Sequence, residues 1–300
     1  MRTFLLAGLF SIVLSFPVTA QVQIIPVNPA QTGALIQSIH GDHLALIDTT
    51  LKLLNKLVLM IVGTGASARD NLPFDSFAAS RGYHVISLDY NNTVITTACS
   101  NSADSACFNN FRQEIVFGEP VSELVAVDSA NSIYHRFYEL LLYLSKKYPR
   151  QGWQQYVNGN AIQWQKIIVA GHSQGAGHAA YLGKKFPVYR VLIFAGPQDY
   201  LVHFNSPASW LSQKGVTNSS KYFAFLHLKD PFDFNKQLAG CLQLMQAVKA
   251  DTILVQPGAA VTTSRHILVT NIESANPHGS MLQPVFTKAW TYLLSADPSK

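Results

Sequence analysis

Short runs of continuous apolar residues alternate along this chain with longer segments of helical periodicity. The apolar runs cover residues 57–62, 83–88, 166–170, 190–195, 222–228, 252–255 and 266–270. The helical segments cover residues 70–81, 121–148, 175–185, 235–248 and 281–294. Continuous apolar strands are typical of parallel sheets buried on both faces, and alternation with helices is the pattern of βαβ units. We therefore predict an α/β fold: one doubly wound domain with a mainly parallel sheet.

The composition supports a large folded domain. Of 300 residues, 48% are hydrophobic and 13% are charged, which excludes a mainly disordered chain. The 22 Lys and Arg residues are scattered, and against 17 Asp and Glu residues they give a net charge of +5. A scattered excess of this size does not form the basic face that nucleic-acid binding requires, so we expect no nucleic-acid partner.

The first twenty residues have the pattern of a secretory signal peptide. Arg2 supplies a positive charge, an apolar run extends from Phe4 to Phe16, and Val18-Thr19-Ala20 offers a cleavage site. The run is shorter than the ~20 residues that a membrane span needs, and no later segment is long and apolar enough. We predict a signal peptide over residues 1–20, one domain over 21–300 without an integral membrane segment, and a secreted or periplasmic protein.

Export would place the three cysteines in an oxidising compartment. Cys99 and Cys107 lie in the polar segment 96–110, where a disulfide that closes a local loop is plausible. Cys241 lies in an apolar helical stretch, which favours a buried free thiol. Three cysteines allow three single pairings, and the sequence does not choose among them. The surrounding segment, residues 91–120, is long for a loop and could form a functional flap or a small cap.

The run Gly171-His172-Ser173-Gln174-Gly175 matches the pattern Gly-x-Ser-x-Gly. It follows directly on an apolar strand and opens a helix, and a serine at such a junction sits on a sharp turn that exposes its hydroxyl. The flanking glycines are needed because the turn brings backbones too close for a Cβ atom. We therefore predict Ser173 as a nucleophile, and the alternative is a structural turn with an idle serine.

A serine hydroxyl is a weak nucleophile and needs a base that a third group orients. His278 lies in a turn between the last predicted strand and the last predicted helix, where a base can reach the carboxyl ends of the strands. Asp230 ends an apolar strand between Ser173 and His278 in the chain, and we predict it as the acid. Asp233 and Asp199 also follow strands and stay open as alternatives.

The oxyanion that forms during acyl transfer needs N–H donors. One is the backbone N–H of Gln174, directly after the nucleophile. The second is expected from the glycine-rich loop after residue 62, with Thr64 as the first choice and Gly65 as the second. Gly65 and His172 are also expected to contact substrate. Trp210 could line the substrate cleft, and the alternative is that it packs in the core.

We expect no cofactor and no metal. The glycine-rich loop is not followed by Gly-Lys-Ser/Thr, so the phosphate-binding loop pattern fails. His40-Gly41-Asp42-His43 resembles part of a metal site, but no further ligands occur at a recognisable spacing.

On these residues the chain resembles the α/β-hydrolase superfamily over about residues 50–298. The run Gly-His-Ser-Gln-Gly-Ala is similar to the nucleophile elbow of cutinases and secreted carboxylesterases, and its extension to Ala180 resembles a group of exported α/β-hydrolases. The resemblance implies a sheet of about eight strands, no cofactor, and acyl transfer to water through an acyl-serine. The loop at Thr64 lacks the His-Gly-Gly-Gly of hormone-sensitive lipases, and segment 91–120 departs from cutinases, so neither specific activity carries over.

These features predict a secreted serine hydrolase of carboxylic esters. Ser173 would attack the carbonyl, His278 would transfer the proton, and Asp230 would orient His278. We expect a monomer that acts on a small-molecule or polymeric ester. One alternative is an exported peptidase or amidase of the same fold, although the chain is too short for an added β-propeller. The other is a catalytically dead binding protein of this fold, which the intact set of three residues disfavours.

Overall fold

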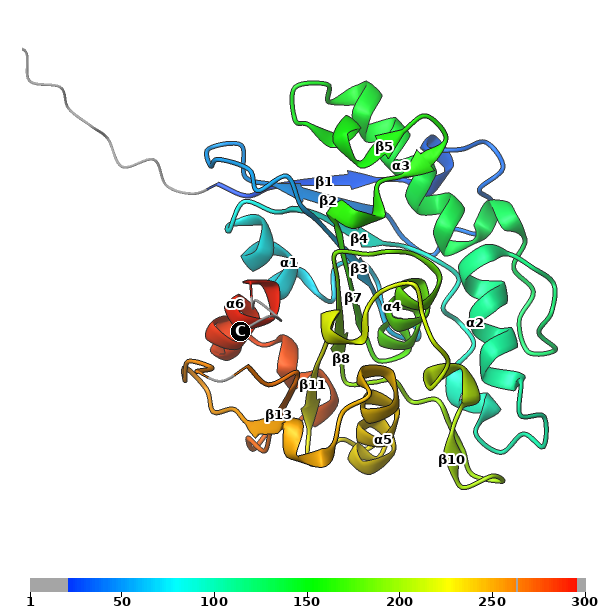
Figure 1. The fold of residues 1–300 in the computed structure, drawn as a ribbon. Helices are drawn as coiled ribbons and strands as arrows, with labels where there is room; N and C mark the ends of the chain where they lie inside the picture. Colours follow the sequence, from blue (N-terminus) through cyan, green and yellow to red (C-terminus); the bar gives the residue numbers. More distant parts are fainter. Residues whose placement is uncertain (1–20, 263, 296–300) are drawn as a thin grey trace, which may run out of the picture.

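The computed structural model describes residues 21–262 and 264–295 (Figure 1). The predicted signal peptide, residues 1–20, lies outside the described residues. Within them, nine strands form one sheet in the order β1-β2-β4-β3-β7-β8-β11-β13-β12. Strand β2 is antiparallel to both of its neighbours, and the strands from β4 to β12 in this order run parallel. The predicted doubly wound, mainly parallel sheet is therefore confirmed.

The strands and helices have the following bounds. The strands of the large sheet are β1 (Gln23–Val27), β2 (His43–Ile47), β3 (Leu57–Ile61), β4 (His84–Leu88), β7 (Ile167–His172), β8 (Arg190–Phe194), β11 (Tyr222–His227), β12 (Thr252–Leu254) and β13 (Ile267–Thr270). Two small hairpins pair β5 (Val157–Asn158) with β6 (Ala161–Ile162) and β9 (Tyr200–Leu201) with β10 (Ser206–Pro207). The α-helices are α1 (Leu72–Ala79), α2 (Cys107–Phe117), α3 (Ile133–Lys147), α4 (Gln174–Lys185), α5 (Phe234–Met245) and α6 (Thr287–Ser295).

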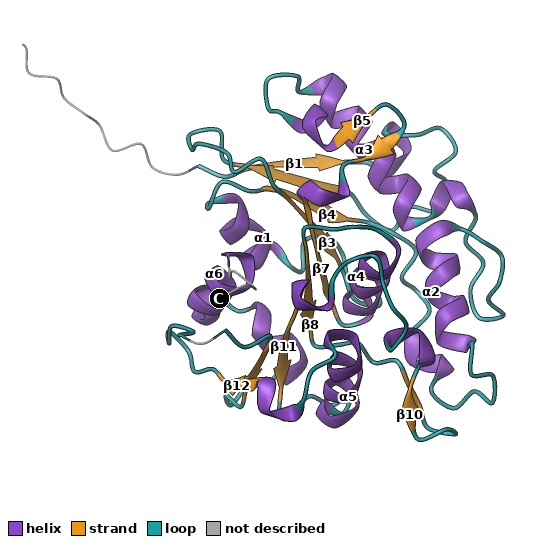
Figure 2. Ribbon diagram, viewed as in Figure 1, coloured by secondary structure: helices purple, strands orange, loops and turns teal. Residues whose placement is uncertain are grey.

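Helices cover both faces of the sheet, so the structure has three layers (Figure 2). Successive side chains of a strand point to opposite faces, and the central strands divide accordingly. In β3, Leu57, Leu59 and Ile61 belong to one apolar core, whereas Val58 and Met60 belong to the other. The first core is covered by α2, α3, α4 and α5, and the second by α1 and α6. Burial on both faces explains why these strands are continuously apolar.

Strands β1 and β2 and helix α2 were not expected from the sequence. Strand β1 is an edge strand in which only Ile25 and Val27 are buried, so its apolar pattern is short. Helix α2 carries Arg112 and Glu114 among its buried residues, and these charges interrupt its apolar stripe. Because α2 packs against α3 and α4, residues 107–117 belong to the helical layer.

The structure contains the local disulfide, one of the three pairings that the sequence allows. Cys99 and Cys107 form a disulfide that joins the segment after β4 to the start of α2. Cys241 is a buried free thiol on α5. Both observations confirm the expectations from the sequence.

Helix α3 begins at Ile133, twelve residues later than expected. The segment before it cannot be helical, because the Glu114 carboxylate accepts the backbone N–H groups of Val121, Ser122 and Val127 at 2.8–3.1 Å. The Ser132 side chain then caps the helix. Among the described residues, we find no helix with the length and apolar character needed to cross a membrane.

The turn between β7 and α4 is packed directly against the end of β3. A Cβ atom at Gly175 would lie 2.1 Å from the Ile61 carbonyl oxygen, and one at Gly171 would lie 2.1 Å from the Gly175 carbonyl oxygen. Both positions therefore require glycine for steric reasons, as the Gly-x-Ser-x-Gly pattern predicts. The backbone of the turn contacts the backbone at the end of β3, and this contact fixes the position of the turn above the sheet.

We predict that Gly175→Ala destabilises the fold by about 3 kcal/mol or more, since the added methyl overlaps backbone atoms that cannot rotate away. The free energy of unfolding in urea measures this effect. Gly41→Ala is the matched control, because the nearest atom to its new Cβ is 3.9 Å away. A Gly175→Ala protein as stable as the control variant would contradict the close packing of this turn.

Candidate active site

Ser173 lies on the turn between β7 and α4 in a strained backbone conformation. Its φ of 57° and ψ of −122° lie outside the regions that L-residues ordinarily adopt. The Ser173 N–H donates to the carbonyl of Phe194 at the end of β8 over 2.9 Å, and Ser173 is 8% exposed. The turn thus holds the hydroxyl at the carboxyl edge of the parallel strands.

Asp230 and His278 come from two other loops at this edge and are hydrogen-bonded to each other. Asp230 follows β11, and His278 lies in a 3-10 turn after β13. His278 Nδ1 donates to Asp230 Oδ2 over 2.8 Å, and the Phe232 N–H donates to Oδ1 over 2.8 Å. Because the carboxylate only accepts, Nδ1 is the donor in this bond, and in the neutral imidazole the lone pair is then on Nε2.

The Asp230 carboxyl is buried and ionised. Burial acts to raise its pKa, but the hydrogen bond and the charge of His278, with the Phe232 N–H, outweigh this effect and lower the pKa. The Phe232 ring also contacts the His278 ring, with 4.6 Å between centroids. The pair is therefore held by both polar and apolar contacts.

The two alternative acids are engaged elsewhere. Asp199 is fully buried in an ion pair with Arg112 and also accepts the indole N–H of Trp210 over 2.9 Å. Asp233 is half-exposed and caps α5 by accepting the Asn235 N–H over 3.0 Å. Of the three candidates, Asp230 is the one whose side chain is bonded to His278.

The loop of His278 is attached to the Ser173 turn through His172. His172 Nε2 lies 2.8 Å from the His278 carbonyl oxygen and must donate to it. Burial, followed by the neighbouring His278, lowers the pKa of His172 to about 4, so its ring is neutral at neutral pH. His278 Nε2 is buried and has no hydrogen-bond partner among the described residues. The loop that carries His278 is therefore hydrogen-bonded to His172, the residue before Ser173.

The glycine-rich loop after β3 is held beside Ser173 by Asn92. The Asn92 side-chain amide donates from Nδ2 to the carbonyls of Gly63 and Ala66, each over 2.8 Å, and the Asn92 backbone carbonyl accepts the Gly65 N–H over 3.0 Å. Gly65 is therefore no free N–H donor. Within residues 21–262 and 264–295, the Thr64 N–H has no hydrogen-bond partner. Gly65 borders open space, because a Cβ there would meet no atom within 4 Å.

Gln174 joins this loop to the Ser173 turn through its side chain. Its Oε1 accepts the Thr64 hydroxyl over 2.8 Å and the Thr96 N–H over 2.9 Å. Its carbonyl accepts Arg112 Nη1 over 2.7 Å. As the first residue of α4, Gln174 has a backbone N–H without a partner inside the helix. The Thr64 hydroxyl thus ties the loop after β3 to Gln174, the residue directly after Ser173.

Trp210 packs in the core, which is one of the two alternatives that the sequence left open. It is 2% exposed, its indole donates to Asp199, and its ring packs against Tyr181 at 5.2 Å between centroids. Its burial favours the core alternative over a place in a substrate cleft, because its indole N–H and its ring both contact interior residues.

Three residues at the site were not anticipated in these roles: Asn92, Arg112 and Gln198. Asn92 and Arg112 act through contacts with distant segments, which leave no local pattern in the sequence. Gln198 is different, because it follows β8 at the sheet edge and donates from Nε2 to Ser173 Oγ over 3.2 Å. Its position after the predicted strand 190–195 could have identified it, because the same position made Asp199 a candidate.

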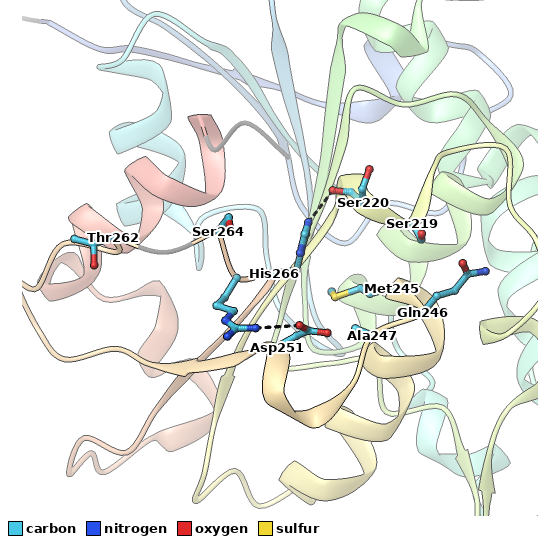
Figure 3. Close-up of a pocket in the computed structure, with 10 residues that line it drawn as sticks. Ser219, Ser220, Met245, Gln246, Ala247, Asp251, Thr262, Ser264 and His266 are labelled. Atoms are coloured by element: carbon cyan, nitrogen blue, oxygen red, sulfur yellow. Dashed lines mark hydrogen bonds and ion pairs between the residues drawn. The ribbon is translucent and has the colours of Figure 1, made fainter. Parts of the chain in front are cut away.

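A hollow of about 800 Å³ lies at the opposite edge of the sheet. Its lining includes Ser220, Asp251 and His266, which lie one or two residues before the first residues of β11, β12 and β13, respectively (Figure 3). Within it, Arg265 forms an ion pair with Asp251, and His266 Nε2 contacts the Ser220 carbonyl oxygen. Because Ser173, Asp230 and His278 follow the carboxyl ends of their strands, this hollow is separate from the candidate site. Among the described residues, no group of three or more His, Cys, Asp or Glu is placed to hold a metal ion.

The strand order, the helices on both faces, and the Gly-x-Ser-x-Gly turn followed along the chain by Asp230 and His278 define an α/β-hydrolase fold. No family model matches this chain, and no curated protein matches it in sequence. A bacterial heroin esterase aligns with 93% of this chain and 84% of its own, at 14% identity and a TM-score of 0.45. A Klebsiella pneumoniae protein provisionally assigned as a dienelactone hydrolase aligns with 92% of this chain and 99% of its own, at 10% identity and a TM-score of 0.49.

We predict that the His172 ring stays neutral until the pH falls to about 4. Its folded pKa lies below the ordinary value of about 6.5, so the unfolded chain binds more protons between these values. The stability that neutral His172 contributes is therefore complete above about pH 6.5 and is lost as the pH falls toward 4. Histidine ring NMR measures the titration, with His172→Asn to assign the signal. A His172 signal that titrates near pH 6.5 in the folded protein would contradict its burial.

Proposed function

We propose that this protein is a serine hydrolase that cleaves carboxylic esters through an acyl-serine intermediate. The observation that carries the proposal is the 2.8 Å hydrogen bond from His278 Nδ1 to the buried Asp230, in a loop bound to the strained Ser173 turn. A carboxylate, an imidazole and a serine in this chain order are what acyl transfer on an α/β-hydrolase fold requires.

In the proposed reaction, Ser173 Oγ attacks the ester carbonyl while His278 Nε2 takes its proton. Asp230 holds the ring by Nδ1 and stabilises the imidazolium that forms. His278 then returns the proton to the departing alcohol, and water repeats the sequence on the acyl-serine. The free Nε2 lone pair and the ionised state of Asp230 suit these steps.

The negative charge on the carbonyl oxygen needs donors that are in place beforehand. We assign this role to the backbone N–H groups of Gln174 and Thr64. The bond from the Thr64 hydroxyl to Gln174 Oε1, together with the grip of Asn92 on the loop, supports fixed positions for both donors. The N-terminus of α4 adds the positive end of a helix dipole.

A disulfide and the N-terminal sequence support a place outside the cytoplasm for this hydrolase. The Cys99–Cys107 disulfide suits an oxidising compartment, as does the signal-peptide pattern of residues 1–20.

We assign His172 a positioning role, since its Nε2 donates to the His278 carbonyl. Gly65 is the residue of this loop that borders open space, and we assign it to contact with the substrate.

Replacement of Ser173 by Ala tests the proposal directly. We predict that the wild-type protein hydrolyses p-nitrophenyl esters of at least one acyl length, and that Ser173→Ala lowers kcat/KM by at least about 10⁴-fold. Thermal unfolding of the variant controls for its fold. Equal turnover by both proteins would reject Ser173 as the nucleophile. Matched amide substrates distinguish an amidase, and tight ester binding without product release would indicate a binding protein.

The choice of acid can be tested with two aspartates that lie three residues apart. We predict that Asp230→Asn lowers kcat by about 10³- to 10⁴-fold, because the amide no longer selects the correct His278 tautomer. Asp233→Asn should leave kcat within about twofold, since Asn also caps helices well. A larger loss of kcat in Asp233→Asn than in Asp230→Asn would overturn the assignment.

A further inference from the structure

Gln198 places a buried amide against the hydroxyl of Ser173. It lies four residues after the end of β8 and is 5% exposed. Its Nε2 donates to Ser173 Oγ over 3.2 Å. Neither the Asp230–His278 pair nor the two backbone donors explain why a polar side chain is buried at this atom.

The backbone around Gln198 is fixed on both sides. Before it, a Cβ at Gly196 would lie 2.8 Å from Ala176 Cβ and 3.0 Å from the Ser173 carbonyl oxygen, so this segment packs on the turn itself. After it, the Asp199 carboxylate is held by Arg112 and Trp210. The Gln198 carbonyl also accepts the Tyr200 N–H over 2.9 Å. The amide therefore meets Oγ from a rigid support.

Counting donors and acceptors assigns the direction of this hydrogen bond. A serine hydroxyl has one hydrogen and two lone pairs. If the hydrogen passes to His278 Nε2 in the proposed reaction, the amide that contacts Oγ must act as a donor, and Nε2 of Gln198 is one. A carboxamide turned the other way would take the serine hydrogen and leave the base without it.

We propose that Gln198 is a catalytic residue whose N–H stabilises the negative charge that develops on Ser173 Oγ. The inference rests on the proposed function. As the Oγ–H bond breaks, the proton moves to His278 Nε2, an Oγ lone pair forms the new bond to carbon, and the carbonyl π pair moves to oxygen. The Gln198 N–H bond is strongest while Oγ carries charge, because hydrogen bonds to charged groups exceed those to neutral groups. The same contact assists Oγ as the leaving atom in deacylation.

Two substitutions test the role of the amide. Gln198→Met keeps the length but removes the donor, and we expect a 10- to 100-fold loss in the acylation rate constant for p-nitrophenyl acetate, equal at every pH. Gln198→Glu is isosteric and titrates. Below the Glu pKa its carboxyl can donate to Oγ, and above that pKa the carboxylate accepts the serine hydrogen and repels the developing charge. The activity of this variant relative to wild type should therefore fall as the pH rises.

Controls separate this inference from the proposed function and from a structural role. Ser173→Ala tests the function alone, and if wild type and Ser173→Ala are equally inactive, both the function and this inference fail. Gln213→Met, at an exposed site, controls for loss of an amide, and circular dichroism checks each fold. If wild type is active, acylation by Gln198→Met within twofold of wild type overturns the role of Gln198. A loss in Gln198→Glu that does not vary with pH also overturns it, because a purely structural defect does not titrate.

Discussion

The close contact between the Ser173 turn and the end of β3 is the constraint on which the site depends. Gly171 and Gly175 permit it, since a Cβ at either position would overlap backbone atoms. Ser173 in this turn has a positive φ, and the loop after β3 lies beside it, since a Cβ at Gly63 would be 3.1 Å from Ser173 Cβ. Steric packing therefore positions the turn that carries Ser173.

A second layer of polar contacts keeps this turn in place from behind. Arg112 reaches from α2 to the Gln174 carbonyl and pairs with Asp199, and all of these groups are buried. A buried ion pair adds little net stability, but the loss of one partner leaves a costly unpaired charge. We interpret the pair as a clamp that joins α2, α4 and the segment after β8. Because Gln198 directly precedes Asp199, the ion pair of Asp199 with Arg112 also restricts the backbone of Gln198.

The parts of this structure that follow from local pattern were predictable from the sequence. The buried parallel strands are continuous apolar runs, and Ser173, Asp230 and His278 each come shortly after one. What depends on distant contacts was not predictable. Helix α2 was not predicted because its buried side carries Arg112 and Glu114. Helix α3 begins later than predicted because the backbone before it is bonded to the Glu114 carboxylate. Asp230 was separable from Asp199 only once the ion pair of Asp199 with Arg112 was seen.

We propose that His278 makes the Ser173 hydroxyl nucleophilic. Treatment with a fluorophosphonate, followed by peptide mass spectrometry, tests it most directly, because the reagent modifies serines that a neighbouring base activates. We expect one adduct, on Ser173, and almost none in a folded His278→Gln variant. An unmodified Ser173 in the wild-type protein, or equal modification with and without His278, would contradict the claim.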